Sequence, residues 1–174
     1  MNHKTLGVFC FLACTGLGAQ ALQALEVSVE SADGEYCKVS FINAQENTRG
    51  LYQGQCKEGV PDGAGTVLYR NGDRFEGTFS NGVINGRGTL TSASGNVYEG
   101  NWVDGHRHGE GRFTWARGSQ YVGDWIADQR HGKGTFTWAN GNRFEGEFRN
   151  NKRHSGTYYT TSGRIVQCQS GRCE

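Results

Sequence analysis

The sequence is poor in proline, in net charge and in long apolar runs, and each shortage excludes a class of protein. It has one Pro, and its 28 Gly follow no three-residue period, which excludes a collagen-like chain. Its 18 basic and 17 acidic residues nearly cancel, so it lacks the basic excess of a nucleic-acid-binding module. After residue 25 no apolar run is long enough to span a bilayer.

Glycine and aromatic residues are abundant instead. Four Trp, seven Tyr and nine Phe provide too much apolar surface for a disordered glycine-rich tail, so we expect the chain to fold. Its 174 residues are the usual length of one structural unit. The composition therefore predicts a single folded and nearly neutral body.

The first 21 residues have the order of a secretory signal peptide. Lys4 precedes an apolar run over 6–14, and small residues follow up to Ala19-Gln20-Ala21. The apolar run is shorter than the about 20 residues of a transmembrane anchor, so we expect cleavage between Ala21 and Leu22 and export to the periplasm or medium. The short leader favours a bacterial source. An alternative is a lipid-anchored envelope protein modified at Cys14, because residues 11–14 loosely resemble a bacterial lipobox.

Cleavage after the leader leaves four cysteines, an even number in an oxidising compartment, which predicts two disulfides. We expect Cys168–Cys173, because these thiols flank a short glycine-containing turn, together with Cys37–Cys56. A metal site or a redox pair would need CxxC or CxxH spacing, and these four residues have neither. The two bridges would stabilise the two ends of the fold.

Glycine recurs along the chain with a constant period of 23 residues. The positions are Gly54, Gly77, Gly100, Gly123 and Gly146. An aromatic column from Tyr52 to Phe144 keeps the same period, which identifies a repeat protein. The fifth unit is one residue shorter, because Gly156 follows Gly134 after 22 residues. The expected organisation is a signal peptide (1–21), an N-terminal cap (22–51), five repeats (52–74, 75–97, 98–120, 121–143 and 144–166) and a C-terminal cap with a disulfide hairpin (167–174).

Each repeat contains two short alternating stretches separated by polar turns, which predicts a β-hairpin. In the unit 121–143 the alternation places aromatic and glycine residues on one face and polar residues on the other. The inner face would hold Tyr121, Gly123, Trp125, Gly134, Phe136 and Trp138. A glycine between two rings would let a ring of the neighbouring strand lie over bare backbone. We therefore predict an all-β fold, an elongated single-layer antiparallel meander of tandem hairpins.

The repeats closely resemble the MORN repeat. The units Phe75-Glu-Gly-Thr-Phe, Tyr98-Glu-Gly-Asn-Trp and Phe144-Glu-Gly-Glu-Phe carry its pattern of aromatic, Glu, Gly, any residue and aromatic. A polar turn and a Gly-x-Gly pair follow, and the match covers residues 52 to about 163. Asp128 and Asn151 depart from the pattern, because each replaces the turn glycine. The resemblance implies a protein-interaction scaffold, a dimerising strut or a binder of acidic phospholipids.

Two sets of residues are candidate binding sites. The basic turns, which the period places along one edge, could contact phosphate head groups or an acidic partner. They contain His106, Arg107, His108, Arg130, His131, Lys152 and Arg153. The tryptophans of the third and fourth units could stack against sugars or a partner's aromatic side chains. They are Trp102, Trp115, Trp125 and Trp138. The competing interpretations are solvated turns for the first set and core packing for the second.

No catalytic constellation is present in the sequence. The recurring Glu76, Glu99 and Glu145 are expected to pair across strands with basic residues such as Arg74 and Arg143. The histidine column of His108, His131 and His154 has a spacing of about 10 Å between units, too wide for a shared metal ion. The Gly-x-Gly pairs precede strands and not helices, so they lack the N-terminus that binds a dinucleotide.

We therefore expect a non-enzymatic exported scaffold with no cofactor, no metal and no nucleic-acid partner. Its partner would be another protein or a second copy of itself, as in a homodimer. The alternative is a peripheral protein that binds anionic membranes through its basic turns.

Overall fold

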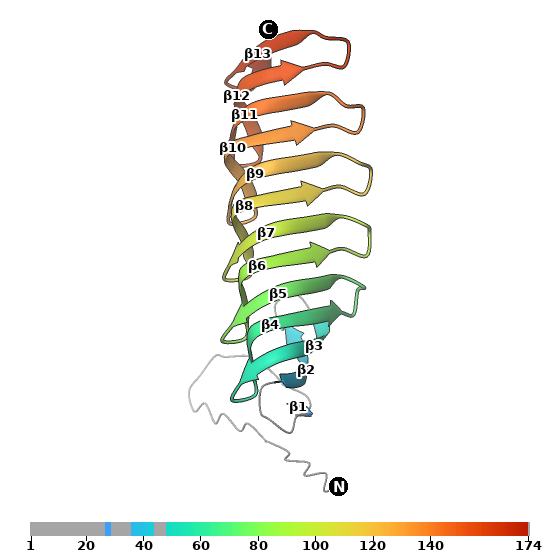
Figure 1. Ribbon diagram of the computed structural model, residues 1–174. Coiled ribbons are helices and arrows are strands. Elements are labelled where there is room, and N and C mark those ends of the chain that lie inside the picture. Colours follow the sequence, from blue (N-terminus) through green and yellow to red (C-terminus); the bar gives the residue numbers. More distant parts are fainter. Residues whose placement is uncertain (1–26, 29–35, 44–47, 174) are drawn as a thin grey trace, which may run out of the picture. The chain divides into compact units, whose positions relative to one another are not determined.

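The computed structural model describes residues 27–28, 36–43 and 48–173 (Figure 1). The signal peptide, its cleavage at Ala21 and Leu22, and the alternative lipidation of Cys14 lie outside these residues. The chain divides into two compact units, unit 1 over residues 1–83 and unit 2 over residues 84–174. The expectation of one structural unit is corrected accordingly. Repeats contact mainly their neighbours in the chain, so no single core has to unite them.

The described part of the chain is built from β-strands and turns. Unit 1 contains β1 (Val27–Ser28), β2 (Tyr36–Asn43), β3 (Thr48–Lys57), β4 (Val60–Tyr69) and β5 (Arg74–Ser80). The next strand, β6 (Val83–Thr91), begins at the last residue of unit 1 and otherwise belongs to unit 2. Unit 2 also contains β7 (Val97–Val103), β8 (His106–Thr114), β9 (Gln120–Ile126), β10 (Gln129–Thr137), β11 (Arg143–Arg149), β12 (Lys152–Tyr159), β13 (Ile165–Gln169) and β14 (Arg172–Cys173). No helix that could cross a membrane is found over the described ranges.

Within each unit, strands that follow one another in the chain pair antiparallel. Unit 2 is an open layer in which successive hairpins lie side by side (Figure 1). The prediction of an all-β antiparallel meander of hairpins is confirmed. In unit 1, β2 pairs with β3 ahead of the first repeat hairpin, with Cys37 opposite Gly54.

The register within one repeat follows the predicted alternation of faces. Tyr121 of β9 lies opposite Phe136 of β10, and Gly123 lies opposite Gly134. Phe136 in turn lies opposite Phe144 of β11. Every second residue of these strands therefore points to the same aromatic face.

The paired glycines are needed because a tyrosine ring lies directly over them. A Cβ added to Gly134 would lie 2.5 Å from the hydroxyl oxygen of Tyr121 and 2.6 Å from its ring carbons. The ring is fully buried, and its hydroxyl donates a hydrogen bond of 3.0 Å to the carbonyl of Asp124. The predicted packing of a ring over bare backbone is confirmed.

A β-bulge lies between the polar turn and the glycine pair in four repeat hairpins, which are β3–β4, β7–β8, β9–β10 and β11–β12. In β10 the register shifts between Arg130 and Gly134, and Gly132 there has φ of 61°. The matching bulge of β12 is shorter, because only His154 is unpaired between Arg153 and Ser155. The residue that the fifth repeat lacks is therefore missing from its bulge.

The two ends of the array differ in their cysteines. Cys168 and Cys173 lie opposite each other on β13 and β14 and form the predicted disulfide, with a Cα–Cα distance of 4.0 Å. Cys56 is a free, half-buried cysteine in the structure. The side chain of Cys37 lies outside the described residues, so the Cys37–Cys56 bridge stays a prediction.

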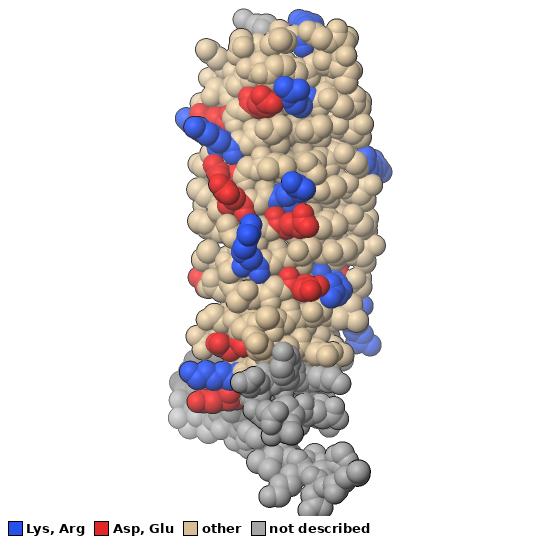
Figure 2. All heavy atoms as spheres, viewed as in Figure 1, with Lys and Arg blue, Asp and Glu red and all other residues tan. Residues whose placement is uncertain are grey.

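Charged side chains of both signs lie next to one another over unit 2 in the space-filling view (Figure 2). The expected pairing of glutamates with arginines across strands is wrong for two of the pairs. Arg74 contacts Glu76 at 2.7 Å and Arg143 contacts Glu145 at 2.6 Å, in both cases two residues apart on the same strand. Residues i and i+2 of a strand share a face, so these long side chains reach each other along it.

Candidate functional site

The candidate site is assembled in unit 2 from aromatic rings and from the arginines that cover them. The innermost rings belong to the first strand of each repeat hairpin. Tyr121 contacts Trp125 with centroids 5.3 Å apart, and contacts Phe148 of the next repeat at 4.9 Å, both edge to face. These rings are buried, and they form the core that holds neighbouring repeats together.

The predicted tryptophan set divides into two classes. Trp102 and Trp125 are 5% and 3% exposed, so they belong to the core. Trp115 and Trp138 are half-buried, so part of each ring is open to a partner. The positions of the residues along the strands explain the difference. Trp102 and Trp125 lie within strands that are flanked by other strands, whereas Trp115 and Trp138 are the first residues of turns.

Trp115 and Trp138 belong to a continuous chain of half-buried rings that we call the aromatic row. Successive centroids lie 4.5, 5.2, 4.6 and 5.3 Å apart. The members, in order, are Phe113, Trp115, Phe136, Trp138 and Tyr158. In the preceding repeat of unit 2 the columns of Phe113 and Trp115 hold Leu90 and Ser92. The aromatic row is therefore specific to the later repeats of this unit.

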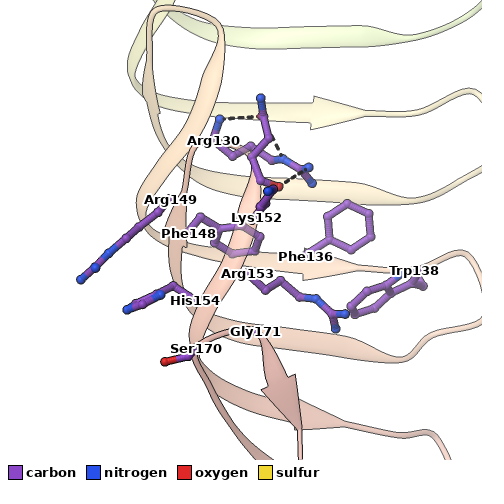
Figure 3. A pocket seen from close by; sticks show the side chains of 11 residues that line it. Arg130, Phe136, Trp138, Phe148, Arg149, Lys152, Arg153, His154, Ser170 and Gly171 are labelled. Carbon is purple, nitrogen blue, oxygen red and sulfur yellow. Dashed lines mark hydrogen bonds between the residues drawn. The ribbon is translucent and has the colours of Figure 1, made fainter.

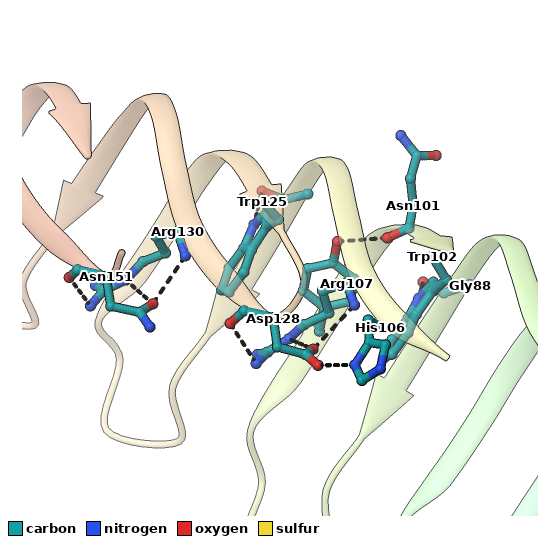
Figure 4. A network of polar contacts seen from close by, with 11 residues as sticks. Gly88, Asn101, Trp102, His106, Arg107, Trp125, Asp128, Arg130 and Asn151 are labelled. Carbon is teal, nitrogen blue, oxygen red and sulfur yellow. Dashed lines mark hydrogen bonds and ion pairs between the residues drawn. The ribbon is translucent and has the colours of Figure 1, made fainter. Parts of the chain in front are cut away.

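Arg107, the first arginine of the basic turns, is held by an acidic residue from the next turn (Figure 4). Its backbone nitrogen donates to Asp128 Oδ1 at 3.1 Å, and its Nε donates to the same oxygen at 2.8 Å. His106 Nδ1 lies 2.6 Å from the other carboxylate oxygen. The guanidinium is also 4.6 Å from the centroid of Trp125. We call this arrangement, an arginine held from the following turn, the turn clasp.

The electrostatics of this clasp favour the ionised carboxylate. Burial alone would raise the pKa of Asp128, but hydrogen bonds from His106 and Arg107 outweigh it and lower that pKa below its ordinary value. Asp128 has φ of 67°, the left-handed conformation that glycine adopts in the equivalent turn at Gly105. An aspartate tolerates this conformation, and its side chain adds the contact that glycine cannot make.

The second arginine has a neutral clasp. Asn151 Oδ1 accepts from the backbone nitrogen of Arg130 at 3.0 Å, and the Asn151 carbonyl accepts from the guanidinium at 2.8 Å (Figure 4). The guanidinium lies 5.5 Å from the centroid of Phe136 and 5.8 Å from that of Trp115. Burial lowers the pKa of Arg130 from its ordinary value. The amide of Asn151 accepts hydrogen bonds but carries no negative charge, so it does not compensate the positive charge of Arg130.

The third arginine has no clasp at all. Arg153 is exposed, and its guanidinium lies 5.3 Å from the centroid of Trp138 and 5.6 Å from that of Phe144. The corresponding turn ends in Gly171, which has no side chain. Across the described residues, the guanidinium of Arg153 has no hydrogen bond or ion pair and only these ring contacts.

A hollow of about 560 Å³ lies beside Arg153 in unit 2 (Figure 3). Its lining residues are Arg130, Phe136, Trp138, Phe148, Arg149, Asn151, Lys152, Arg153, His154, Ser170 and Gly171. None of these is acidic. Arg149 is engaged by Glu147 at 3.1 Å, and its hydrogen bond lowers the pKa of that carboxyl. We call this feature the cationic hollow, and its uncompensated charges belong to Arg130, Lys152 and Arg153.

The predicted basic turns are therefore brought together only in part. Arg130, Lys152 and Arg153 line the cationic hollow, whereas His106 and Arg107 are engaged by Asp128. His108 and His131 are half-buried beside their bulges and do not line it. Over the described ranges, no group of three potential ligands lies close enough to hold a metal ion.

The sequence reasoning missed the role of Asp128 and Asn151, which it treated only as departures from the repeat pattern. A usable signal was present. Each is a side-chain acceptor in place of a turn glycine, 21 residues after an arginine in the preceding turn. Such a pair predicts a contact between adjacent turns, because the repeat places those turns side by side.

Comparison with known proteins agrees with this architecture. No curated protein matches the chain. The family model for the MORN repeat matches residues 52–74, 75–97, 98–120, 121–143 and 144–163, which is more than half of the chain. MORN repeats are generally protein or membrane interaction modules. With five matched repeats that fold as antiparallel hairpins, the chain belongs to the MORN repeat family.

Proposed function

We propose that this protein is a non-enzymatic scaffold that binds another protein, or a second copy of itself, along the aromatic row of unit 2. The observation that carries the proposal is the continuity of the row. Five half-buried rings contact one another in sequence, so partly exposed apolar surface extends across several repeats. Extended apolar surface bordered by cations is typical of protein interfaces, where aromatic residues and arginine are enriched.

Membrane binding through the basic turns is the second candidate function. The exposed Lys152 and Arg153 favour it, because cations near an anionic lipid surface each contribute about 1 kcal/mol of attraction. Two features make it the weaker candidate. Arg107 is neutralised by Asp128, and the guanidinium groups of Arg107 and Arg130 cover rings instead of projecting from the turns.

We also propose that the protein acts outside the cytoplasm, as an exported protein of bacterial type. The Cys168–Cys173 disulfide supports this, because such bonds persist in oxidising compartments. The leader pattern of residues 1–21 supports it as well. Intact mass of the protein isolated from its native host, under non-reducing conditions, tests the proposal. A chain that begins at Leu22 supports export, and a lipidated Cys14 would replace soluble export with a membrane-anchored form.

Site-specific photo-crosslinking tests the binding surface. A photoreactive phenylalanine derivative replaces Trp115, which lies in the aromatic row, and in a matched control it replaces Arg112. Arg112 is an exposed neighbour of Phe113 on β8, and the strand alternation places it on the opposite face. We expect a discrete protein adduct, with a partner or with a second copy, from the first position only. Equal adducts from both positions, or none from Trp115, would contradict a partner on the aromatic row.

A further inference from the structure

Three arginines at equivalent positions of the turns of unit 2 differ in how far their positive charge is compensated. Asp128 neutralises Arg107, Asn151 binds Arg130 without neutralising it, and Gly171 leaves Arg153 without a clasp. The uncompensated positive charge therefore rises along the series and is greatest where the cationic hollow opens (Figure 3). Adjacent cations repel one another, so this end of the unit is stabilised by any anion that enters.

We propose that the cationic hollow binds an acidic segment of a protein partner. Carboxylates of that segment contact Arg153, Lys152 and Arg130, and an aromatic or apolar side chain of the segment packs against Trp138 and Phe136. The inference rests on the proposed function, because it names the partner chemistry at one end of the aromatic row.

The chemistry of Arg153 fits a carboxylate. The guanidinium of Arg153 makes no hydrogen bond to the described residues, so its N–H groups are available for a bidentate contact with a carboxylate. The guanidinium of Arg153 already lies 5.3 Å from the centroid of Trp138 (Figure 3), so this cation–π contact positions the side chain before a ligand arrives. The loss of side-chain entropy on binding is correspondingly small.

The shape of the site favours a peptide over a bilayer. The cations line a concave hollow that also exposes Phe136 and Trp138 (Figure 3). A hollow of about 560 Å³ accommodates a few side chains, which is the scale of a short peptide segment. A planar lipid surface would instead meet only the outermost cations, and the rings would contribute nothing to it.

Asn151→Asp is the sharpest test, because it converts the neutral clasp of Arg130 into the charged one that Arg107 already has. Asp128 has the same left-handed backbone in its own turn, with φ of 67° against 68° at Asn151. The variant therefore keeps the fold while it cancels one cation of the hollow. Arg153→Ala removes the unclasped cation. Arg143→Ala is the matched control, since Arg143 lies 4.2 Å from the Tyr159 ring centroid but is paired with Glu145 and does not line the hollow.

Fluorescence anisotropy with the full-length protein measures the effect. The probe is a labelled synthetic peptide of alternating glutamate and tyrosine, and its control replaces every glutamate by glutamine. We expect the glutamine peptide to bind at least about tenfold more weakly, and Asn151→Asp and Arg153→Ala each to weaken binding of the glutamate peptide about tenfold. Arg143→Ala should leave the affinity unchanged. Melting temperatures of all variants verify that they are folded.

Three results would overturn the inference. The first is no binding of the glutamate peptide to the native sequence, and the second is equal binding to that sequence and to both hollow variants. The third is binding of phosphatidylglycerol vesicles, but of neither peptide, in an Arg153-dependent manner, which would assign the hollow to membranes. If the peptide fails while Trp115 still cross-links a partner, the scaffold proposal survives and only the acidic partner is rejected.

Discussion

Asp128 accepts hydrogen bonds from both the backbone nitrogen and the guanidinium Nε of Arg107, a residue 21 positions earlier in the chain. A single carboxylate thus ties two adjacent turns of unit 2 together and fixes an arginine over Trp125. Backbone pairing alone would hold the turns side by side, but it would leave the arginine free to rotate. The clasp therefore couples the order of the turns to the position of a cation.

The clasp predicts an acid-sensitive contribution to stability. The folded-state pKa of Asp128 is lowered below its ordinary value of 3.8, so its contribution is present above that pH and is lost as pH falls through the folded pKa. Asp128→Asn should lower the free energy of unfolding by about 1 kcal/mol at neutral pH. The difference from the native sequence should shrink as the pH falls below 3.8. Urea denaturation across this range measures it, and a difference that is constant with pH would contradict the ionic clasp.

Gly134→Ala should be strongly destabilising through crowding of Tyr121. The added Cβ would lie 2.5 Å from the tyrosine hydroxyl, so we expect a loss of about 3 kcal/mol. Gly163→Ala is the control for backbone strain alone, because its φ is 85° and nothing lies within 4 Å of the added carbon. It should cost about 1 kcal/mol. Equal losses for the two variants in chemical denaturation would rule out the ring as the cause.

Alkaline pH should destabilise unit 2 through Tyr98. Burial raises the pKa of this tyrosine from 10.0 to about 12, while Arg107 lowers that pKa by a smaller amount and Asp128 raises it by a smaller amount. A raised folded pKa means that the stabilisation is complete below pH 10 and is lost as the pH rises towards 12. Tyr98→Phe should remove this part of the pH dependence. Stability measured by denaturation in this range tests it, and the same alkaline slope in both proteins would exclude Tyr98 as its source.

The Cys168–Cys173 bridge should stabilise the last hairpin. It closes a short loop, so Cys173→Ser should cost about 2 kcal/mol in the chain-entropy estimate, less than a bridge between distant residues. Hydrogen exchange should report the loss in β13 and β14 while β9 keeps its protection. Loss of protection throughout unit 2 would show that the bridge supports more than its own hairpin. In the native sequence, a disulfide-linked peptide that joins Cys37 to Cys56 in non-reducing peptide mass spectrometry would identify the second predicted bridge.

The architecture could be predicted from the sequence because it follows from periodicity. The 23-residue glycine columns and the alternation around Tyr121 specify which residues share a strand face, and the structure confirms both. The glutamate partners could not be predicted in the same way. Periodicity places Arg74 and Glu76 on the same strand face, but it does not decide whether such a glutamate pairs along its own strand or across to the next one.

The candidate site was predictable in composition but not in arrangement. Sequence reasoning selected Arg130 and Arg153 as members of basic turns along one edge, but it did not foresee that their guanidinium groups lie over aromatic rings. How far the charge of a turn arginine is compensated depends on which residue of the next turn can hold it. That information lies in Asp128 and Asn151, which a consensus reading treats as irregularities of the pattern.

The short bulge of the fifth repeat shows how the array can vary in length without losing its pattern. Deleting a residue from a regular strand would exchange the inner and outer faces beyond the deletion. In β12 the deletion falls in the bulge, so Arg153 still lies opposite Phe148 and Gly156 still lies opposite Gly146. A bulge can therefore gain or lose a residue without changing the register of the strand on either side of it. Repeats of unequal length can then be joined in one chain while every ring keeps its neighbour.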